Sequence, residues 1–354
     1  MNKFINREDA LLINRILIVG FGSIGKRHLR LARELLPNAD IMVLRHQLST
    51  SVPDNADGSF SSIEQAIAFA PNIAVIANPA TYHIDTAQAF ANAGVHLLVE
   101  KPLSASLDGV EHLIETCREQ GLVLMTGYNL RFLPSLQKFR SLLLDSAIGK
   151  VLSVRCEIGQ YLPTWRPDDD YRQSVSACHK LGGGVLLELS HEVDYLRWIF
   201  GEVDSVKATL SRQSNLDIDV EDTAHLILRF NQAEDGFQLI GTLNLDFVRH
   251  DTTRQCTVIG EKGSLRWNGL TGVVEIFEEG AKEWQELFNT QHQRDDSYRA
   301  EWQHMLSCIN ELQIPLISGE DGLKVLHIIE AARKSSESGN QIKIKQLLEG
   351  KNSA

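Results

Sequence analysis

The sequence predicts an α/β protein: a doubly wound parallel sheet in the N-terminal part, then an α+β domain with an open, mainly antiparallel sheet. Two observations support this. Up to about residue 127, short apolar runs alternate with segments of helical spacing, as in βαβ units. Beyond it, strand-like segments follow one another closely. A chain of 354 residues is expected to form two domains. We place them at residues 1–127 and 128–354, with the terminal helices free to pack back on the first domain.

The elements are predicted from apolar runs bounded by turn residues. Residues 15–20 read RILIVG, a continuous apolar run that suits a strand covered on both faces. Further strands of the first domain are expected at 41–44, 73–77, 96–99 and 122–125, and helices at 26–36, 62–69, 86–93 and 107–120. In the second domain, strands are expected at 152–158, 205–210, 224–230, 236–245 and 254–259, and helices at 135–144, 185–200, 298–312 and 322–335.

Composition excludes several classes of function. Apolar residues make up 43% and charged residues 23%, so the chain can build a core and is not mostly disordered. Lys and Arg number 35 against 46 Asp and Glu, and the formal net charge of −11 disfavours nucleic acid as a partner. One basic cluster without interleaved aromatics is interpreted as a solvated helix face: Lys26, Arg27, His28, Arg30 and Arg33.

Cysteine usage and apolar runs indicate a cytoplasmic protein without a membrane partner. The five cysteines, at 117, 156, 178, 256 and 308, form no CxxC pair, so neither a disulfide framework nor a zinc ribbon is expected. The first fifteen residues lack the apolar centre of a signal peptide, and no run nears the ~20 residues of a membrane span. No spacing of histidines and carboxylates predicts a metal site.

A glycine-rich segment follows the first predicted strand and opens a predicted helix: Gly20, Phe21, Gly22, Ser23, Ile24 and Gly25. In this context the GxGxxG spacing predicts a dinucleotide site. Gly20 allows the tight turn, Gly22 the approach of the pyrophosphate and Gly25 close packing. The segment also matches the GxxxxGK of a P-loop, but Arg27 replaces the metal-binding hydroxyl and Asn78 the expected Asp. A dinucleotide is favoured, with a ligand-free turn as the alternative.

The end of the second predicted strand indicates which dinucleotide binds. An NAD site usually has Asp or Glu about 20 residues beyond the glycines, whereas this chain has Arg45 and His46. A guanidinium pairs with a 2′-phosphate, which a carboxylate would repel. We expect NADP(H) to be preferred. The alternative is that Arg45 is a surface charge and that NAD(H) is used.

Polar residues follow the ends of two later predicted strands. They are Asn78, Pro79 and His83 after one strand, and Glu100 and Lys101 after the next. Ligands of doubly wound sheets bind beyond the carboxyl ends of the strands. These residues are therefore expected around the nicotinamide, with Lys101 beside the substrate. A solvated surface lysine is the alternative.

Three glycines at 182–184 precede a predicted helix that carries Glu188, His191 and Asp194 at i, i+3 spacing. Residues so spaced share one side of a helix. A histidine there can act as a general acid or base, since its unperturbed pKa of about 6.5 is close to working pH. The alternative is a capped core helix with a buried His191.

Together these segments resemble the glucose–fructose oxidoreductase / inositol dehydrogenase (Gfo/Idh/MocA) family. The resemblance spans nearly the whole chain and rests on the joint order of GFGSIGKRH, ANPATYH, AGVHLLVEKPLS, GYNLRFLP, GGGVLLELSHEVD and VEDTAHL. It implies a Rossmann domain and a C-terminal domain whose open sheet forms a homodimer or homotetramer. It also implies NAD(P)-dependent oxidation or reduction of a sugar or a related polyol.

The resemblance further implies the roles of two residues. The lysine of the family's Glu-Lys-Pro, here Lys101, contacts the substrate, and the helix histidine, here His191, accepts or donates the proton at the reacting oxygen. The family usually has Asp four residues before that histidine, where this chain has Leu187. Glu188 is the nearest carboxylate and the candidate third catalytic residue. Lys101 would stabilise the alkoxide during hydride transfer.

Aromatic and basic residues before the glycine run indicate an acidic sugar, because aromatic faces suit sugar rings and guanidinium groups suit anions. The substrate-binding candidates are Tyr161, Trp165, Arg166, Tyr171 and Arg172, with Tyr128, Arg131, Asp194, His191 and Lys101. The stretch resembles a subgroup of the family associated with surface-polysaccharide and acidic-sugar biosynthesis. That implies a nucleotide sugar or a sialic-acid-like acid. An ordinary loop at a dimer interface is the alternative.

Three functions fit these observations: a sugar dehydrogenase, a glycosidase or lyase that uses nicotinamide without net redox change, and a non-catalytic dinucleotide sensor. The presence of Lys101 and His191 disfavours the sensor. We expect a dehydrogenase in which Lys101 and His191, supplied by different domains, converge on one nicotinamide ring.

Overall fold

The computed structural model describes residues 13–45, 52–165, 167–233, 235–290, 293, 295–311 and 313–351. The chain divides into two units. The first comprises the described residues up to Gly127 together with Tyr298–Leu323, and the second comprises Tyr128–Ser297 and the described residues from Lys324. A segment from far along the sequence therefore completes the N-terminal unit.

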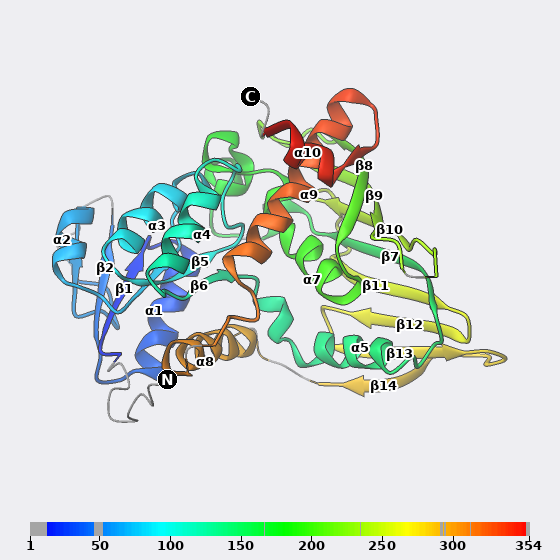
Figure 1. The fold of residues 1–354 in the computed structure, drawn as a ribbon, viewed down its shortest axis with the longest axis horizontal. Coiled ribbons are helices and arrows are strands. Elements are labelled where there is room, and N and C mark those ends of the chain that lie inside the picture. The colour runs from blue at the N-terminus through cyan, green and yellow to red at the C-terminus, as the bar shows by residue number, and fades with distance from the viewer. Residues whose placement is uncertain are drawn as a thin grey trace, which may run out of the picture. The chain divides into compact units, whose positions relative to one another are not determined.

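The described part of the first unit holds a six-stranded parallel sheet in the order β3-β2-β1-β4-β5-β6 (Figure 1). Its strands are β1 (Arg15–Val19), β2 (Asp40–Leu44), β3 (Gly58–Phe60), β4 (Ile73–Ile76), β5 (His96–Glu100) and β6 (Leu124–Gly127). Its helices are α1 (Ser23–Leu35), α2 (Ile63–Ala68), α3 (His83–Asn92), α4 (Val110–Glu119) and α8 (Asp296–Glu311), with the 3₁₀ turn η2 (Ala80–Tyr82). The order reverses between β1 and β4, which is the doubly wound topology.

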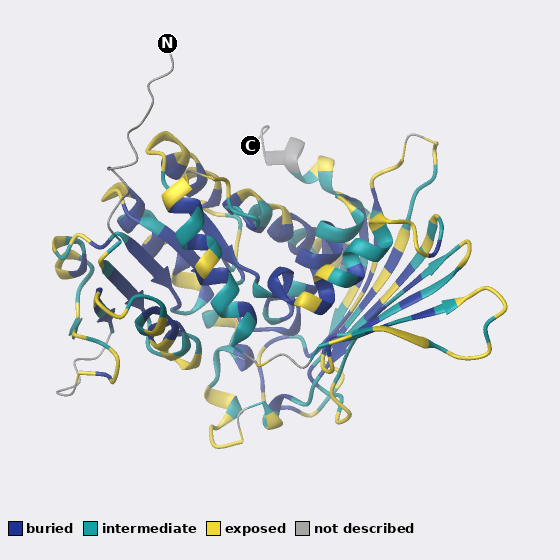
Figure 2. Ribbon diagram, turned by 90° about the horizontal axis from the view of Figure 1, so that it is seen from below, coloured by how far each residue is buried: buried dark blue, intermediate teal, exposed yellow. Residues whose placement is uncertain are grey.

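Apolar runs form these strands because both faces of the sheet are covered. Ile16, Leu17 and Ile18 of β1 are fully buried, and so are the four residues of β4. Figure 2 shows the strands of this sheet in the dark blue of buried residues. Helix α8 adds Trp302 and Met305 to the same core. The N-terminal unit therefore depends on a C-terminal helix for its packing.

The second unit is built on a sheet of nine strands, counted over the residues described above, in the order β14-β13-β12-β11-β7-β10-β9-β8-β15. Strands β7 and β10 pair in parallel, and the other described pairs are antiparallel. The strands are β7 (Val151–Gly159), β8 (Val203–Ser211), β9 (Thr223–Phe230), β10 (Ile240–Asp246), β11 (Thr253–Gly260), β12 (Gly263–Asn268), β13 (Val273–Glu278), β14 (Gln285–Asn289) and β15 (Ile342–Lys343).

The helices of the second unit are short apart from α9. They are α5 (Pro134–Leu144), α6 (Val185–Glu188), α7 (Ser190–Phe200) and α10 (Ile344–Lys351), and α9 (Gly319–Ser338) begins in the first unit and continues into the second. The 3₁₀ turns are η3 (Asn129–Phe132), η4 (Leu162–Thr164), η5 (Tyr171–Gln173), η6 (Val175–Ala177) and η7 (His179–Leu181). Four of these turns lie in the loop between β7 and α6.

One face of the second sheet is buried, and the other is open in the single chain. In β9, Ala224, Leu226 and Leu228 are buried, whereas Ile227 between them is exposed. Successive residues of a strand point to opposite faces, and helices α5 and α6 contact strands of this sheet. The sheet is therefore covered by helices on the side of the buried residues (Figure 2).

One expectation for the second unit is wrong, and several strands were not predicted. The single helix over 185–200 is interrupted, because α6 ends at Glu188, Leu189 has φ −102° and ψ 20°, and α7 begins at Ser190. Strands β12, β13, β14 and the two-residue β15 are absent from the prediction, and β12 and β13 show why. Charged residues such as Arg266 and Glu275 alternate there with the apolar residues that face the core, which weakens the apolar signal.

The structure shows the state of the cysteines and the length and apolar character of the helices. All five cysteines, each within the described ranges, are free, and four of them are buried. Cys156 and Cys256 face each other in register on β7 and β11. Across the described residues, no helix is both long enough and apolar enough to cross a membrane.

Candidate active site

The glycine-rich turn between β1 and α1 leaves one open approach to the backbone. Gly20 has φ +91°, and a Cβ there would lie 2.6 Å from the carbonyl oxygen of Ala77. A Cβ at Gly25 would lie 2.2 Å from the carbonyl oxygen of Gly20. At Gly22, by contrast, no heavy atom of the described residues lies within 4 Å of that position. Two glycines are thus needed for packing, and the third faces open space, as the approach of a phosphate requires.

The start of α1 can bind an anion. Ser23 is its first residue, Gly22 stands at the N-cap without a side chain, and the first turn holds no acidic residue. Phe21 and Ile24 pack against the core of the unit and fix the turn. Free N–H groups and the positive end of the helix dipole therefore point toward an incoming phosphate. These residues fit the pyrophosphate of a dinucleotide.

Arg45 follows β2 beside this turn. Its guanidinium carbon lies 5.5 Å from the centre of the Phe21 ring, and Lys26 Nζ lies 5.3 Å from the same centre. Nη2 of Arg45 donates to Ser59 Oγ at 3.2 Å. Two cations thus flank the turn near the end of the second strand, where the ribose of a dinucleotide is held in this fold. The other residue predicted here, His46, lies outside the described residues.

His83 ties the turn after β4 to the turn that carries Lys101. Its Nε2 lies 2.8 Å from the carbonyl oxygen of Asn78, and its Nδ1 lies 2.9 Å from that of Pro102. The Lys101–Pro102 peptide is cis. Burial lowers the pKa of His83, although the two carbonyls favour its charged form. Both ring nitrogens contact backbone carbonyls and so join the turns that carry Asn78 and Lys101, while the predicted contact of His83 with the cofactor stays a prediction. Pro79 stands at the N-cap of η2.

Glu100 is held from two sides beneath Lys101. Its Oε1 lies 2.7 Å from His28 Nε2, and its Oε2 accepts the backbone N–H of Lys101 at 3.1 Å. The indole N–H of Trp302 donates to His28 Nδ1 at 2.9 Å. An indole N–H only donates, so Nδ1 of His28 is the acceptor. The proton of the neutral ring is then on Nε2, which donates a hydrogen bond to Glu100. The assignment of His28 to a solvated helix face is therefore wrong, because His28 lies on the buried face of α1 beside Gly25.

Glu301 of α8 completes this buried group. Ligand atoms of His28, Glu100 and Glu301 lie within 4.8 Å of one another. Neither carboxyl oxygen of Glu301 has a hydrogen-bond partner among the described residues. Burial, together with the negative charge of Glu100, raises the pKa of Glu301 well above its usual value. Since the bond from Trp302 leaves the proton on Nε2, this imidazole has no lone pair for a metal, and the cluster is better described as a protonated Glu301 beside an ionised Glu100.

His191 on the first turn of α7 contacts two charged residues that no motif predicted. Arg254 Nη2, from β11, lies 2.5 Å from His191 Nε2. Oε1 of Glu192 lies 3.1 Å from the same nitrogen and 3.0 Å from Arg254 Nε. The side chain of His191 is 12% exposed and that of Glu192 is fully buried. The imidazole can therefore be reached, while the carboxylate beside it is shielded from water.

The surroundings of Glu192 are otherwise neutral. Burial opposes its charge, yet Arg254 and His191 hold the pKa of Glu192 below its usual value. Its Oε2 lies 3.8 Å from Cys156 Sγ, which lies 2.8 Å from the Tyr195 hydroxyl. Burial raises the pKa of both Cys156 and Tyr195 well above the usual range. Both groups therefore stay protonated beneath the charged pair of Arg254 and Glu192.

Sequence reasoning missed Arg254 because 63 positions separate it from His191. Strand pairing brings it there, since Arg254 stands opposite Ile158 in the ladder of β11 and β7. The local signal is Gly269, at the end of β12. A Cβ at Gly269 would lie 2.5 Å from Arg254 Cδ, so the glycine leaves room for the arginine side chain. Glu192 was available from the sequence as the neighbour of His191.

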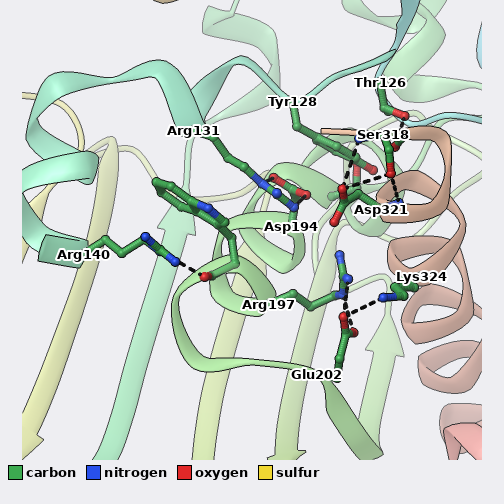
Figure 3. A network of polar contacts seen from close by, with 12 residues as sticks. Thr126, Tyr128, Arg131, Arg140, Asp194, Arg197, Glu202, Ser318, Asp321 and Lys324 are labelled. Carbon is green, nitrogen blue, oxygen red and sulfur yellow. Dashed lines mark hydrogen bonds and ion pairs between the residues drawn. The ribbon is translucent and has the colours of Figure 1, made fainter. Parts of the chain in front are cut away.

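Glu188 and Asp194 are placed differently from His191. Glu188 ends α6, before the break at Leu189. Asp194 accepts from Arg131 Nε at 2.8 Å and from Nη2 at 2.6 Å, and both side chains are buried (Figure 3). The break at Leu189 therefore separates Glu188 from the helix that carries His191 and Asp194. Asp194 and Arg131 form a buried ion pair, and their predicted contact with the substrate, like the catalytic role of Glu188, stays a prediction.

Tyr128 also faces the interior of the second unit. It is fully buried, and its hydroxyl donates to Ser190 Oγ at 3.4 Å. Burial raises the pKa of Tyr128 above its usual value. Figure 3 shows its ring near the pair of Arg131 and Asp194. Tyr128 belongs to the packing around the start of α7, and its predicted contact with the substrate stays a prediction.

Two family profiles match the chain. One, described as the NAD-binding Rossmann fold of an oxidoreductase family, covers residues 14–128. The other, described as the C-terminal alpha/beta domain of that family, covers residues 140–344. The chain belongs to the Gfo/Idh/MocA oxidoreductase family. It is therefore an oxidoreductase-type enzyme whose first unit is a nicotinamide-dinucleotide-binding Rossmann domain, as the motifs predict.

Relatives of this Gfo/Idh/MocA protein act on sugars and polyols. Myo-inositol 2-dehydrogenase of Thermotoga maritima is 29% identical over 288 residues, 78% of this chain and 82% of that protein. Levoglucosan dehydrogenase in complex with NADH and L-sorbose has a similar fold, with a TM-score of 0.81 and 19% identity over 94% of this chain and 98% of that one. The WlbA dehydrogenase of Bordetella pertussis in complex with NADH and UDP-GlcNAcA has a TM-score of 0.75 to this chain. It is 23% identical over 93% of this chain and 98% of that one.

The loop after β7 carries the residues predicted to meet the sugar. The Tyr161 ring lies 4.2 Å from that of His250, and Trp165 packs edge-on against Phe247 at 5.1 Å. The Tyr171 hydroxyl accepts the backbone N–H of Asp217 at 3.3 Å. Two donors of Arg172 bind the carboxylate of Asp170 at 2.8 and 2.9 Å. Arg166 lies outside the described residues. The aromatic rings are thus fixed by local contacts before any substrate binds.

Proposed function

We propose that this oxidoreductase uses NADP(H) to interconvert a hydroxyl and a carbonyl group of an anionic sugar, with Lys101 and His191 as its catalytic residues. The proposal rests on the combination of three features in this chain, which belongs to the family. It has a phosphate-sized opening at Gly22, a lysine on the turn after β5, and a partly exposed imidazole on α7.

The chemistry divides between the two side chains. During oxidation, His191 takes the proton from the sugar hydroxyl, and during reduction it returns that proton. The ammonium group of Lys101 stabilises the negative charge that develops on the same oxygen. The nicotinamide, when bound, supplies or accepts the hydride. Glu100 holds the backbone N–H of Lys101 at 3.1 Å and so fixes where the lysine side chain starts.

A turnover assay tests this division. The absorbance of reduced nicotinamide is followed with a panel of neutral and acidic sugars, for the wild type and for Lys101→Ala. Turnover should fall at least about a hundredfold in the variant. Lys150→Ala, which removes an exposed lysine paired with Asp235, is the control. Near-normal turnover of Lys101→Ala would refute the role. Sugar conversion that needs the cofactor but leaves its absorbance unchanged would instead establish the glycosidase or lyase reaction.

The preference for NADP(H) is proposed from Arg45. A guanidinium beside the Phe21 ring offers charge-assisted hydrogen bonds to a 2′-phosphate, which contribute roughly 1.5–3 kcal/mol. Arg45→Gln should therefore raise the KM for NADPH roughly tenfold or more and leave the KM for NADH nearly unchanged. Arg30→Gln, on the exposed side of α1, is the matched control. A wild type that prefers NADH would remove this part of the proposal.

An anionic sugar is proposed from the aromatic and basic residues of the loop after β7. The rings of Tyr161 and Trp165 suit a sugar face, and Arg172 suits a carboxylate or phosphate. The UDP-GlcNAcA bound to the related WlbA dehydrogenase is such a sugar. In the same panel, acidic or nucleotide sugars should give a higher kcat/KM than their neutral counterparts. A neutral sugar or inositol as the best substrate would contradict this choice.

The assembly and location are proposed on further grounds. The open face of the second sheet exposes Ile227 on β9 and Ile240 on β10, which favours a homodimer or homotetramer through this face. Ile227→Glu should then lower the mass measured by light scattering to that of one chain, and an unchanged oligomer would argue for another interface. The free cysteines favour the cytoplasm.

A further inference from the structure

The contact between Arg254 and His191 fixes where the imidazole can hold its proton. Arg254 Nη2 lies 2.5 Å from His191 Nε2. A guanidinium has donors only, so this contact is attractive only when Nε2 presents a lone pair. In this arrangement His191 is a neutral imidazole whose Nε2 is free of a proton. That is the form a general base must have before it acts.

Glu192 favours the opposite state of the same nitrogen. Its Oε1 lies 3.1 Å from Nε2, and a carboxylate only accepts hydrogen bonds. Once Nε2 carries a proton, the charge of the imidazolium is balanced by this buried carboxylate. The same oxygen lies 3.0 Å from Arg254 Nε. These two atoms form an ion pair and not a hydrogen bond, since neither has a hydrogen-bond partner within the described residues. Glu192 therefore balances the charge of Arg254 whichever state His191 adopts.

We infer that Arg254 and Glu192 are positioning residues that make His191 a reversible proton acceptor, Arg254 holding Nε2 unprotonated before the reaction and Glu192 holding the imidazolium after it. This rests on the proposed function. In oxidation, the hydroxyl takes the place of Nη2 at Nε2, its O–H bond breaks and the N–H bond forms. The nicotinamide, when bound, would accept the hydride of the C–H bond that breaks. Arg254 stays paired with Glu192 by charge. Reduction reverses each step.

The packing around the pair supports this assignment. Gly269 leaves room for the methylene groups of Arg254, because a Cβ there would lie 2.5 Å from Cδ. Cys156 of β7 and Tyr195 of α7 face the other oxygen of Glu192, and Cys256 of β11 faces Cys156. Burial keeps Cys156 and Tyr195 protonated, so neither adds a charge. The charges that contact His191 from β11 and α7 are therefore opposite in sign.

Titration of His191 by NMR, assigned by comparison with His191→Asn, tests the inference without any substrate. Arg254→Gln removes the cation beside the imidazole, so the midpoint of the His191 titration should rise by about one pH unit. Glu192→Gln removes the anion, so the same midpoint should fall by about one pH unit. Arg254→Lys keeps the charge and should stay close to the wild type. Shifts in the same direction, or no shift in either variant, would overturn the inference. Glu192→Asp keeps the negative charge but places it farther from His191, so it should shift the midpoint of the His191 titration less than Glu192→Gln does. It replaces Glu192→Gln if that variant does not fold.

The pH dependence of kcat/KM gives the second readout. Its acidic limb should move to higher pH in Arg254→Gln and to lower pH in Glu192→Gln, which a merely structural defect would not produce. Arg266→Gln removes an arginine of β12 that pairs with Glu275 and should leave the limb where it is. If the His191 midpoints of the two variants shift in opposite directions but the wild type converts no sugar, this inference stands and the proposed function is rejected. Opposite limb movements without the NMR shifts would reject the inference.

Discussion

His28 in the first unit and His191 in the second are each held against a buried glutamate through Nε2. The nitrogen of His28 lies 2.7 Å from Glu100, and that of His191 lies 3.1 Å from Glu192. Burial differs, since His28 is fully buried whereas His191 keeps part of its side chain exposed. The two sites thus share a residue pair but differ in access.

A third residue gives the two histidines different protonation patterns. Trp302 donates to Nδ1 of His28, so Nε2 of that ring carries a proton and donates to its glutamate. Arg254 donates to Nε2 of His191, so that nitrogen presents a lone pair. A histidine beside a glutamate is therefore a fixed structural link in one case and an available base in the other. The difference comes from residues far away in sequence.

Replacing each histidine by asparagine gives the largest contrast. His191→Asn removes the proposed base and should lower turnover at least about a hundredfold with little change in stability. His28→Asn leaves buried groups of Glu100 and Trp302 without their partner, so it should lower the free energy of unfolding by about 1–3 kcal/mol. Turnover and urea unfolding measure the two effects.

His225→Ala is the control for this contrast, because His225 is exposed on β9 and its ring contacts Asn244 on the neighbouring strand. It should change neither quantity appreciably. If His28→Asn lost as much turnover as His191→Asn while remaining folded, the division into a structural and a chemical histidine would be wrong.

Trp302→Phe tests what fixes the proton on His28. The variant removes the donor to Nδ1 and leaves a small void, so it should cost about 1–3 kcal/mol of stability. The nitrogen chemical shifts of His28 should also show a loss of the single tautomer. Trp284→Phe, a half-buried tryptophan that stacks on Arg266, is the matched control. An unchanged tautomer would show that Glu100 alone determines it.

Glu301→Gln should alter the pH dependence of stability. Burial and the charge of Glu100 raise the pKa of Glu301 in the folded state, so folding must take up a proton above the unfolded pKa. That cost is absent at low pH and grows as pH rises. Glutamine carries no charge, so the variant should gain stability over the wild type by at most about 1.4 kcal/mol per pH unit.

Urea unfolding between about pH 5 and about pH 8 measures this difference. Glu320→Gln, at an exposed position of α9, is the matched control. A flat difference for Glu301→Gln would mean that Glu301 is ionised in the folded protein and has a partner cation.

The first unit could be predicted from the sequence because each strand is an apolar run that ends in a turn signal. Residues 15–20 and 73–77 became β1 and β4, and the GxGxxG spacing marked the start of α1. The second sheet was harder, because one face is open and its strands alternate with charged residues. The break at Leu189 has no local signal, since an apolar residue there continues the helical pattern.

The candidate site was predicted only where chain position determines it. Lys101 follows a strand and His191 follows a glycine run, so both could be chosen from the sequence. Arg254 could not, because strand pairing brings it to His191. His28 could have been found, since it stands three residues after Gly25 and four before Ala32 on the buried face of α1. The basic residues that surround His28 in the sequence favoured the prediction of a solvated helix face.

The crystal structure of the ternary complex with NADP⁺ and the sugar identified by the turnover panel tests the central claim most directly. The proposal predicts that Lys101 Nζ and His191 Nε2 both lie within about 2.6–3.2 Å of one hydroxyl oxygen, on the carbon facing the nicotinamide. A complex in which the sugar is bound and oriented for reaction, but these two nitrogens contact different atoms or none of it, would contradict the proposal.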